Sequence, residues 1–547
     1  MKLKPCSIAS SVCAVLWLPA TSAAAAGPQT RAYSPAGYAT VRYVSARAGV
    51  DTADGSRSHP WRSLTHALEA TTANTNARAA ILVAEGTYAG KTLSMRPYVD
   101  LFGGFEAASW KRNIQAHRSV LDGEGKLRVV LGADHARLDG FVIANGRVRG
   151  KGAGLLADGV SPRISNNVFL ENMTLAPVPW KPDKRHETAN DGGGIAVLRG
   201  GSPEISHNLF LRNHTEAGRG AGIACERSSP RIESNVFLDN QTGVADPARS
   251  SDGGGISIFD HSSPLVADNL LVGNRTAASN DGGGIFAALW SAPEIRGNTI
   301  VGSWGDDDGG ALFIGGQQHH YGTPLDPIPP EAQYLVRIDR NLIVGNDNKS
   351  HNAGAGRITM QARAELSHNV MAENTGGLKI ETSGALLEDN RLAGALTITN
   401  TSKASHVLPG PVTLVRDAVR GPIDLQMPAG FRHSCGPGLP GGDANVAAAP
   451  EFVDDAIDAR IASARQDETD ATTTLTIAGR HFAANALAGR VVHAGDTWTI
   501  VKSNGSDTLQ VWGPVGGSAD TLRVLPSYRL RPGTACAKTV QSAALQQ

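Results

Sequence analysis

Three aspartates recur at one position of a repeated phrase and have the spacing for acid–base or metal chemistry. Asp252 and Asp281 each begin the phrase Asp-Gly-Gly-Gly, and Asp308 stands before two glycines, directly after Asp306 and Asp307. If each phrase is one layer of a stack, neighbouring carboxylates lie about 5 Å apart and repel one another, since no basic residue stands in register with them. A shared proton, a bound cation or solvent screening would relieve that repulsion.

Ca²⁺ is the cation that this column suits, because it takes several carboxylate and carbonyl oxygens. The ligands predicted for it are Asp252, Asp281, Asp308 and Asp307. The structural alternative is that each Asp only accepts hydrogen bonds from backbone N–H groups of its turn. Upstream, the same position holds Lys151, Asp191 and Arg219, whose alternating charges can pair without any ligand.

A second group of candidates follows each phrase, on a short strand-like segment and the turn after it. Alternation places the outward side chains of neighbouring layers on one face. Those predicted to be catalytic are Arg199, Arg227, Asp260 and His261, with His319 and Tyr321 from a long loop. Those predicted to stack on or bind sugar are Phe259, Phe286 and Trp290, with Trp180 and Lys181 from another long loop. Together they predict a groove for an extended acidic polysaccharide.

Two cleavage reactions fit these residues. In β-elimination, Ca²⁺ or an arginine, Arg199 or Arg227, neutralises a uronic acid carboxylate, so that a base can remove the adjacent proton. The candidates for that base, or for the acid, are His261, His319 and Tyr321. In hydrolysis, Asp252 and Asp281 have the spacing of a retaining pair, and Asp252 and Asp308 approach that of an inverting pair.

A third reading is a surface or adhesion protein that binds glycan without cutting it. Repeats, turn acids and aromatic residues would look the same in such a protein. The candidates cluster in about three layers, however, and a binding filament would carry them evenly. This clustering favours an enzyme, and we expect a polysaccharide lyase.

The layers themselves are predicted by asparagines that recur at intervals of 27 to 29 residues in several places. The column consists of Asn167, Asn208, Asn235, Asn269, Asn298, Asn341, Asn369 and Asn390. Each unit holds three strand-like pieces separated by Gly, Ser-Pro or Asn turns, which predicts one triangular coil per unit. Alternating apolar residues, such as Ile195 with Val197 or Leu209 with Leu211, are expected to fill the interior. The asparagines are expected to bond to one another along the stack.

The repeated pattern "DGGGI…SP.I..N.F..N" resembles that of the right-handed parallel β-helix superfamily, which includes pectate lyases and related polysaccharide lyases and hydrolases. The resemblance covers about residues 119–396 and implies an all-β, right-handed parallel β-helix solenoid. The pectate-lyase arginine motif, the hydrolase "GHG" triplet and the epimerase "DPHR" do not occur. Catalytic residues therefore cannot be carried over by position.

The ends of the chain predict three further parts around a β-helix of residues 119–450. Residues 27–118 are expected to hold first strands and a capping helix around Trp61 to Ala70. Residues 451–547 hold two halves of a closing motif, "APEFVDD" and "YRLRPGTACA", with a small β module between them that could bind carbohydrate or cap the end. Cys435 and Cys536 are expected to form a disulfide and Cys225 to lie in the core.

Residues 1–26 predict a cleaved secretory signal, because Lys2 and Lys4 precede an apolar stretch and an Ala run. No later stretch is long enough to span a bilayer. The 51 basic and 51 acidic residues balance, so nothing points to nucleic acid. We therefore expect an exported monomer, periplasmic or secreted.

Overall fold

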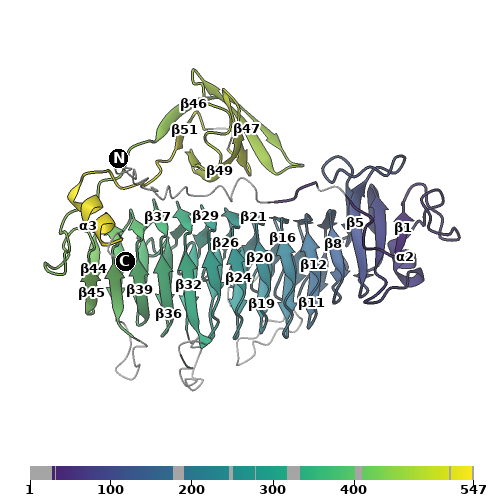
Figure 1. Ribbon diagram of the computed structural model, residues 1–547, viewed down its shortest axis with the longest axis horizontal. Helices are drawn as coiled ribbons and strands as arrows, with labels where there is room; N and C mark the ends of the chain where they lie inside the picture. The colour runs from purple at the N-terminus through teal and green to yellow at the C-terminus, as the bar shows by residue number, and fades with distance from the viewer. Residues whose placement is uncertain are drawn as a thin grey trace, which may run out of the picture.

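The computed structural model describes residues 27–30, 33–176, 190–244, 251–277, 279–316, 330, 333–400, 410–516 and 519–544. In this part the chain is an elongated parallel β-helix with a small barrel on its flank (Figure 1). The fold class predicted from the repeat is thereby confirmed. A fourth short strand per coil was not predicted, and it occurs in the central coils.

The parallel strands form four sheets, which each coil visits in the order sheet 2, sheet 1, sheet 3 and sheet 4. Sheet 1 runs the length of the helix. Its strands in spatial order are β1 (Thr40–Val44), β2 (Ala79–Ala84), β5 (Val99–Phe105), β8 (Arg137–Asp139), β12 (Arg163–Ser165), β16 (Glu204–Ser206), β20 (Arg231–Glu233), β24 (Leu265–Ala267), β28 (Glu294–Arg296), β32 (Leu335–Asp339), β36 (Arg363–Ser367), β39 (Gly384–Glu388), β42 (Val412–Val415) and β45 (Ala429–Arg432).

Sheet 2 follows the Asp-Gly-Gly-Gly turns. Its strands are β4 (Leu93–Ser94), β7 (Val130–Leu131), β11 (Leu155–Asp158), β15 (Ile195–Leu198), β19 (Ile223–Glu226), β23 (Ile256–Phe259), β27 (Ile285–Ala287), β31 (Leu312–Gly315), β35 (Gly356–Thr359), β38 (Leu378–Glu381), β41 (Leu396–Thr399) and β44 (Ile423–Leu425). Equivalent residues pair directly, as Ile256 does with Ile285.

Sheet 3 lies on the side that faces the barrel. Its strands are β3 (Gly86–Ala89), β6 (Ser119–Asp122), β9 (Phe141–Ala144), β13 (Val168–Leu170), β17 (Leu209–Leu211), β21 (Val236–Leu238), β25 (Leu270–Val272), β29 (Thr299–Val301), β33 (Leu342–Val344), β37 (Val370–Ala372), β40 (Arg391–Leu392) and β43 (Ala418–Val419). The short sheet 4 consists of β10 (Arg147–Arg149), β14 (Met173–Leu175), β18 (His214–Thr215), β22 (Gln241–Thr242), β26 (Arg275–Thr276), β30 (Trp304–Gly305) and β34 (Asp347–Asn348).

The interior is filled by alternate side chains of sheets 1, 2 and 3. Ile195 and Val197 lie in it, as predicted. The prediction for Leu209 and Leu211 is wrong: Phe210 points inward and stacks on Phe237 at 4.7 Å, while both leucines point outward. Their outward face is apolar because the barrel covers it.

Two asparagine columns hold the turns of successive coils together. In the predicted column, Asn208 donates its backbone N–H and its Nδ2 to Oδ1 of Asn235, and Asn235 repeats this with Asn269. The second column holds Asn172, Asn213, Asn240, Asn274, Asn346 and Asn374, interrupted by Ser303. These buried amides satisfy turn backbone that would otherwise be unpaired.

Both ends of the helix are closed as the sequence indicates. At the N-terminal end, α2 (Leu64–Ala70) begins at Ser63, whose hydroxyl accepts the N–H of His66, and packs Leu64 and Leu68 on the core. At the other end, the predicted disulfide joins Cys435 to Cys536, where α3 (Ala535–Ala544) begins. Cys225 is buried in the core. Neither described helix combines the length and apolar character needed to cross a membrane.

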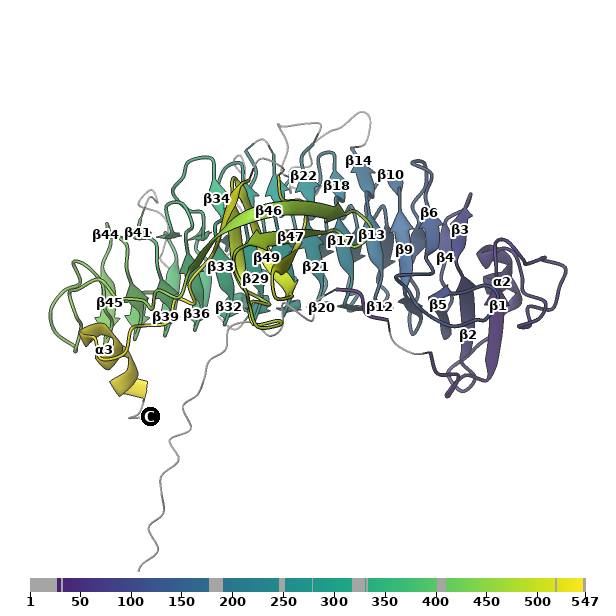
Figure 2. The same ribbon diagram turned by 90° about the horizontal axis from the view of Figure 1, so that it is seen from above.

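The two closing segments pair with each other, since the N–H of Val453 donates to the carbonyl of Arg529. Between them the chain forms a closed antiparallel barrel of β46 (Ile457–Asp467), β47 (Thr472–Ala478), β50 (Thr508–Trp512), β49 (Thr497–Asn504), β48 (Val491–Ala494) and β51 (Thr521–Val524). The barrel lies over the middle of sheet 3 rather than at the end of the helix (Figure 2). Trp512 and Ile500 pack on the outward leucines of sheet 3, so end-capping is not the module's role.

Candidate active site

The Asp-Gly-Gly-Gly phrases form the tight turns that lead from sheet 4 into sheet 2. Gly282 has φ +66°, which favours glycine. A Cβ on Gly283 would lie 2.2 Å from the carbonyl oxygen of Trp304 in the next coil. The glycines let the coils stack closely, and this stacking brings the preceding aspartates into one column.

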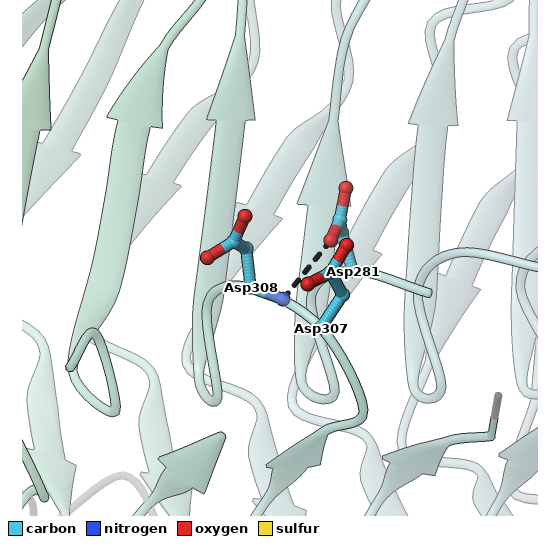
Figure 3. A group of neighbouring side chains, drawn as sticks. All are labelled: Asp281, Asp307 and Asp308. Carbon is cyan, nitrogen blue, oxygen red and sulfur yellow. Dashed lines mark hydrogen bonds between the residues drawn. The ribbon is translucent and has the colours of Figure 1, made fainter. Parts of the chain in front are cut away.

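Asp191, Asp252 and Asp281 each accept a hydrogen bond from the backbone of the next coil. The N–H of Asp281 donates to Oδ1 of Asp252 at 3.1 Å. The N–H of Asp308 donates to Oδ1 of Asp281, also at 3.1 Å (Figure 3). Nearer the N-terminal end of the same column, the N–H of Arg219 donates to Oδ1 of Asp191 at 2.7 Å. The structural role considered for the column is therefore present at Asp191, Asp252 and Asp281, and it occupies one oxygen of each of these three carboxylates.

Two arginines neutralise part of the column. Nε of Arg219 lies 3.3 Å from Oδ2 of Asp252. Arg357, on the outward face of β35, pairs with Asp308 and with Glu381. The expectation of a column without basic neighbours is therefore wrong at Asp308, because a long side chain reaches it from the following coil.

Asp281 differs from both neighbours in its charge environment. Neither Asp281 nor Asp307 forms an ion pair with a cation among the described residues, and carboxylate oxygens of Asp281, Asp307 and Asp308 lie within 4.8 Å of one another (Figure 3). Burial, together with the charges of Asp252 and Asp307, raises the pKa of Asp281 well above its usual value, and Arg357 only partly opposes this. Asp281 therefore tends to hold a proton, while the ion pair favours the carboxylate form of Asp308.

The same three carboxylates form a donor set that suits Ca²⁺. Of the four predicted ligands, Asp252 stands outside this group, and its Oδ2 lies toward Arg219. A cation here would require Asp281 to lose its proton and Asp308 to divide its charge between the ion and Arg357.

The predicted sugar-stacking residues are not available as a surface. Phe259, Phe286 and Trp290 lie outside the coil interior, as alternation predicted, but each is at most 5% exposed. Phe286 stacks on Phe313 at 5.3 Å, and the guanidinium of Arg219 lies 4.0 Å from the ring centre of Phe259. Phe259, Phe286 and Phe313 build a second small core on sheet 2, and Phe259 supports the guanidinium of Arg219 beside the acid column.

The predicted arginine and histidine group lies at the opposite ends of the strands. Arg199, Arg227, Asp260 and His261 follow the strands of sheet 2, whereas the acid column precedes them. Arg227 pairs with Asp260 at 3.1 Å, Nδ1 of His261 lies 2.9 Å from Asp260, and Arg199 pairs with Asp158. The side chains of Arg199 and His261 are 71% and 61% exposed. The described structure therefore forms them into surface ion pairs apart from the acid cluster.

Four further predicted residues, Trp180, Lys181, His319 and Tyr321, lie outside the described residues. The residues that sequence reasoning missed are Arg357 and Glu381. The outward position of Arg357 on β35, in register with Phe313, was readable from the alternation of "GRIT". The pairing of Arg357 with Asp308 could not be predicted, because it depends on how far the arginine side chain reaches from one coil to the next.

Comparison with known proteins supports the fold. Residues 122–300 match the family model described as "Right handed beta helix region". The helix is therefore the right-handed parallel β-helix that the repeat resembled. A search of curated proteins found no match.

Solved structures similar to this chain include two proteins. One is the GH136 lacto-N-biosidase from Eubacterium ramulus, at 11% identity and a TM-score of 0.28, covering 72% of this chain and 66% of that chain. The other is the tailspike protein gp49 of the Acinetobacter baumannii bacteriophage Fri1, a capsular polysaccharide depolymerase, at 8% identity and a TM-score of 0.15, covering 82% and 80%. The chain thus spans just under two thirds of the length of the first enzyme. At these scores the likenesses carry no argument about activity.

Proposed function

We propose that this protein is a carbohydrate-active enzyme that hydrolyses glycosidic bonds of a polysaccharide, with Asp281 as general acid and Asp308 as its carboxylate partner. The substrate class is supported by the resemblance of the repeated pattern to a superfamily that includes polysaccharide lyases and hydrolases, while the matched family model supports the fold. The observation that carries the reaction type is the pairing of Asp281, whose pKa is raised, with Asp308, which Arg357 holds in an ion pair.

The spacing of the two carboxyl groups favours retention of configuration. One oxygen of each lies within 4.8 Å of the other, which suits the separation of about 5 Å in retaining enzymes and is shorter than the roughly 6.5–9.5 Å of inverting enzymes. Asp281 donates its proton to the glycosidic oxygen as the bond from that oxygen to the sugar's anomeric carbon breaks. The Asp308 carboxylate attacks the same carbon and forms a glycosyl ester. Water then cleaves this ester while Asp281 takes a proton from the water.

A polysaccharide lyase is the second candidate, since Asp281, Asp307 and Asp308 can reach one Ca²⁺. That ion would neutralise a uronate carboxylate and acidify the adjacent proton. A lyase also needs a base beside the ion, and among the described residues Arg227 and His261 are held by Asp260 beyond the far ends of the strands. The pairing of a protonated Asp281 with the ion-paired Asp308 therefore supports hydrolysis better than elimination.

Export belongs to the same proposal, and the secretory signal predicted from residues 1–26 supports it. The test is to incubate the mature protein with a panel of acidic and neutral polysaccharides, with Ca²⁺ and then with chelator. Hydrolysis predicts new reducing ends without absorbance near 235 nm and without chelator sensitivity. A chelator-sensitive rise at 235 nm would establish the lyase instead. Binding without either signal would establish a glycan-binding protein.

A further inference from the structure

The barrel carries a hollow of about 720 Å³ that the proposed active site does not use. It lies on the outward face of β46 and β51, beside β48. Alternation builds it: Ile457, Ala459 and Ile461 turn into the barrel core, so Asp458 and Arg460 turn outward. The hollow is therefore a polar surface on a rigid scaffold.

Positive charge converges on this hollow. Arg460, Arg480 and Arg523 line it, against one acid, Asp458. Arg523 lies 3.2 Å from Asp458, and Arg480 donates to the backbone carbonyl of Asp458 at 3.0 Å. The Arg460 side chain makes no hydrogen bond or ion pair with any other described residue. Several guanidinium groups around one hollow attract an anion, and Arg binds carboxylate or sulfate through paired N–H groups.

A second hollow of about 510 Å³ continues from the first at the junction of barrel and helix. His493 and Arg523 line both hollows. The second hollow is also lined by Phe452, Trp498 and the buried Tyr528, and by one further arginine, Arg420, with two acids, Glu373 and Asp454. His493 stacks on Trp498 at 4.0 Å, and the Trp498 ring packs closely against Gly345 of the helix, so His493 rather than Trp498 forms the wall that the two hollows share.

We propose that these two hollows form a second, non-catalytic binding site for an anionic oligosaccharide. Acidic groups of the glycan bind Arg460, Arg480 and Arg523, and the glycan chain continues past His493 into the second hollow. Ligand sites place a few convergent polar groups around a hollow in this way. The saccharide nature of the ligand rests on the proposed function, whereas its negative charge rests on the arginines alone. The site lies on sheet 3's side of the molecule, so it would hold the polymer while sheet 2 acts on another part of it.

The test uses the full chain carrying Asp281→Asn, which prevents cleavage, and titration calorimetry. The probes are a galacturonate hexamer, which carries carboxylates, a heparin hexasaccharide, which carries sulfates, and the neutral cellohexaose. We expect at least one anionic hexamer to bind and cellohexaose not to bind. Adding Arg460→Ala and Arg480→Ala should weaken that binding at least 10-fold. The matched control is Arg465→Ala, an exposed arginine on the same strand outside the hollow, which should change Kd less than 2-fold.

The outcomes separate this site from the proposed function. If neither anionic hexamer binds, or if the two arginine changes leave Kd unaltered, the second site is wrong. If binding depends on these arginines while the wild-type protein cleaves no glycan, the proposed hydrolase is wrong and the second site stands. The choice between carboxylate and sulfate follows from which hexamer binds.

Discussion

Asp417 occupies the position of an asparagine in the predicted column, and its replacement by asparagine should stabilise the protein at neutral pH. Its side chain is fully buried and accepts hydrogen bonds from the backbone N–H and from Nδ2 of Asn390, each at 2.8 Å. Burial nevertheless raises the pKa of Asp417 from 3.8 to about 8. Between about pH 4 and about pH 8, Asp417 therefore keeps a proton in the folded chain that it has released in the unfolded chain.

The sign and size follow from this difference. Because the folded pKa lies above the unfolded one, the free energy of unfolding falls as pH rises from about 4 to about 8. At pH 7, about 3 units above the unfolded pKa, the loss is on the order of 4 kcal/mol. Asp417→Asn keeps an oxygen for Asn390 but turns its amide group toward the N–H of Val415, which now donates to Oδ2 at 3.1 Å. Losing that bond costs about 1–3 kcal/mol, so the net gain at pH 7 is about 1–3 kcal/mol.

The assay is urea unfolding of the wild-type and variant proteins from pH 4 to pH 8, followed by far-ultraviolet circular dichroism. The variant should be less stable than the wild type at pH 4 and more stable at pH 7. Asp424→Asn, an exposed acid on β44, is the matched control and should show no such crossover. A difference between wild type and Asp417→Asn that does not vary with pH would refute the reasoning, because the buried proton would then be absent.

Three further changes follow from the contacts described above. Asp307→Asn removes a charge that raises the pKa of Asp281. Asp281 should then lose its proton at lower pH, so the alkaline limb of the pH profile of kcat should move to lower pH. A limb that does not move would exclude Asp281 as the general acid. Arg357→Met removes the cation that pairs with Asp308. In assays of reducing-end release, this change should lower kcat about 10-fold or more with a smaller change in KM. An unchanged kcat would exclude Asp308 from the mechanism. Trp512→Ala empties the contact between barrel and sheet 3 and should cost about 3–5 kcal/mol of stability, seen as a lower unfolding midpoint; an unchanged midpoint would mean that this contact does not stabilise the molecule.

Much of the fold could be predicted because the stack repeats its own geometry. The asparagine intervals define the coil, and the Ser-Pro and glycine turns separate its strands. Which side chains of sheet 3 point into the interior could not be predicted from Leu209 and Leu211. Both faces of that strand are apolar, one against the core and one against the barrel, so alternation does not distinguish them.

The candidate site was predicted in part. Asp281, Asp307 and Asp308 do come together, because one coil separates equivalent turns. Arg357 was missed because its ion pair with Asp308 joins two different coils, and the two residues stand at different positions of the repeat. The aromatic residues Phe259 and Phe286 were placed on the expected face, but alternation cannot tell an outward residue that is covered from one that is open.

The most direct test of the account compares Asp281→Asn with Asp191→Asn in reducing-end release from a polysaccharide that the wild-type protein cleaves. Both residues occupy the same position of the column, and both accept a backbone N–H from the next coil. Asp191 pairs with Lys151 at 3.0 Å, whereas Asp281 has no cation partner among the described residues. The account predicts a loss of about 10²–10⁴ in kcat for Asp281→Asn and little change for Asp191→Asn. Equal activity of the two variants would contradict the assignment of Asp281 as the general acid.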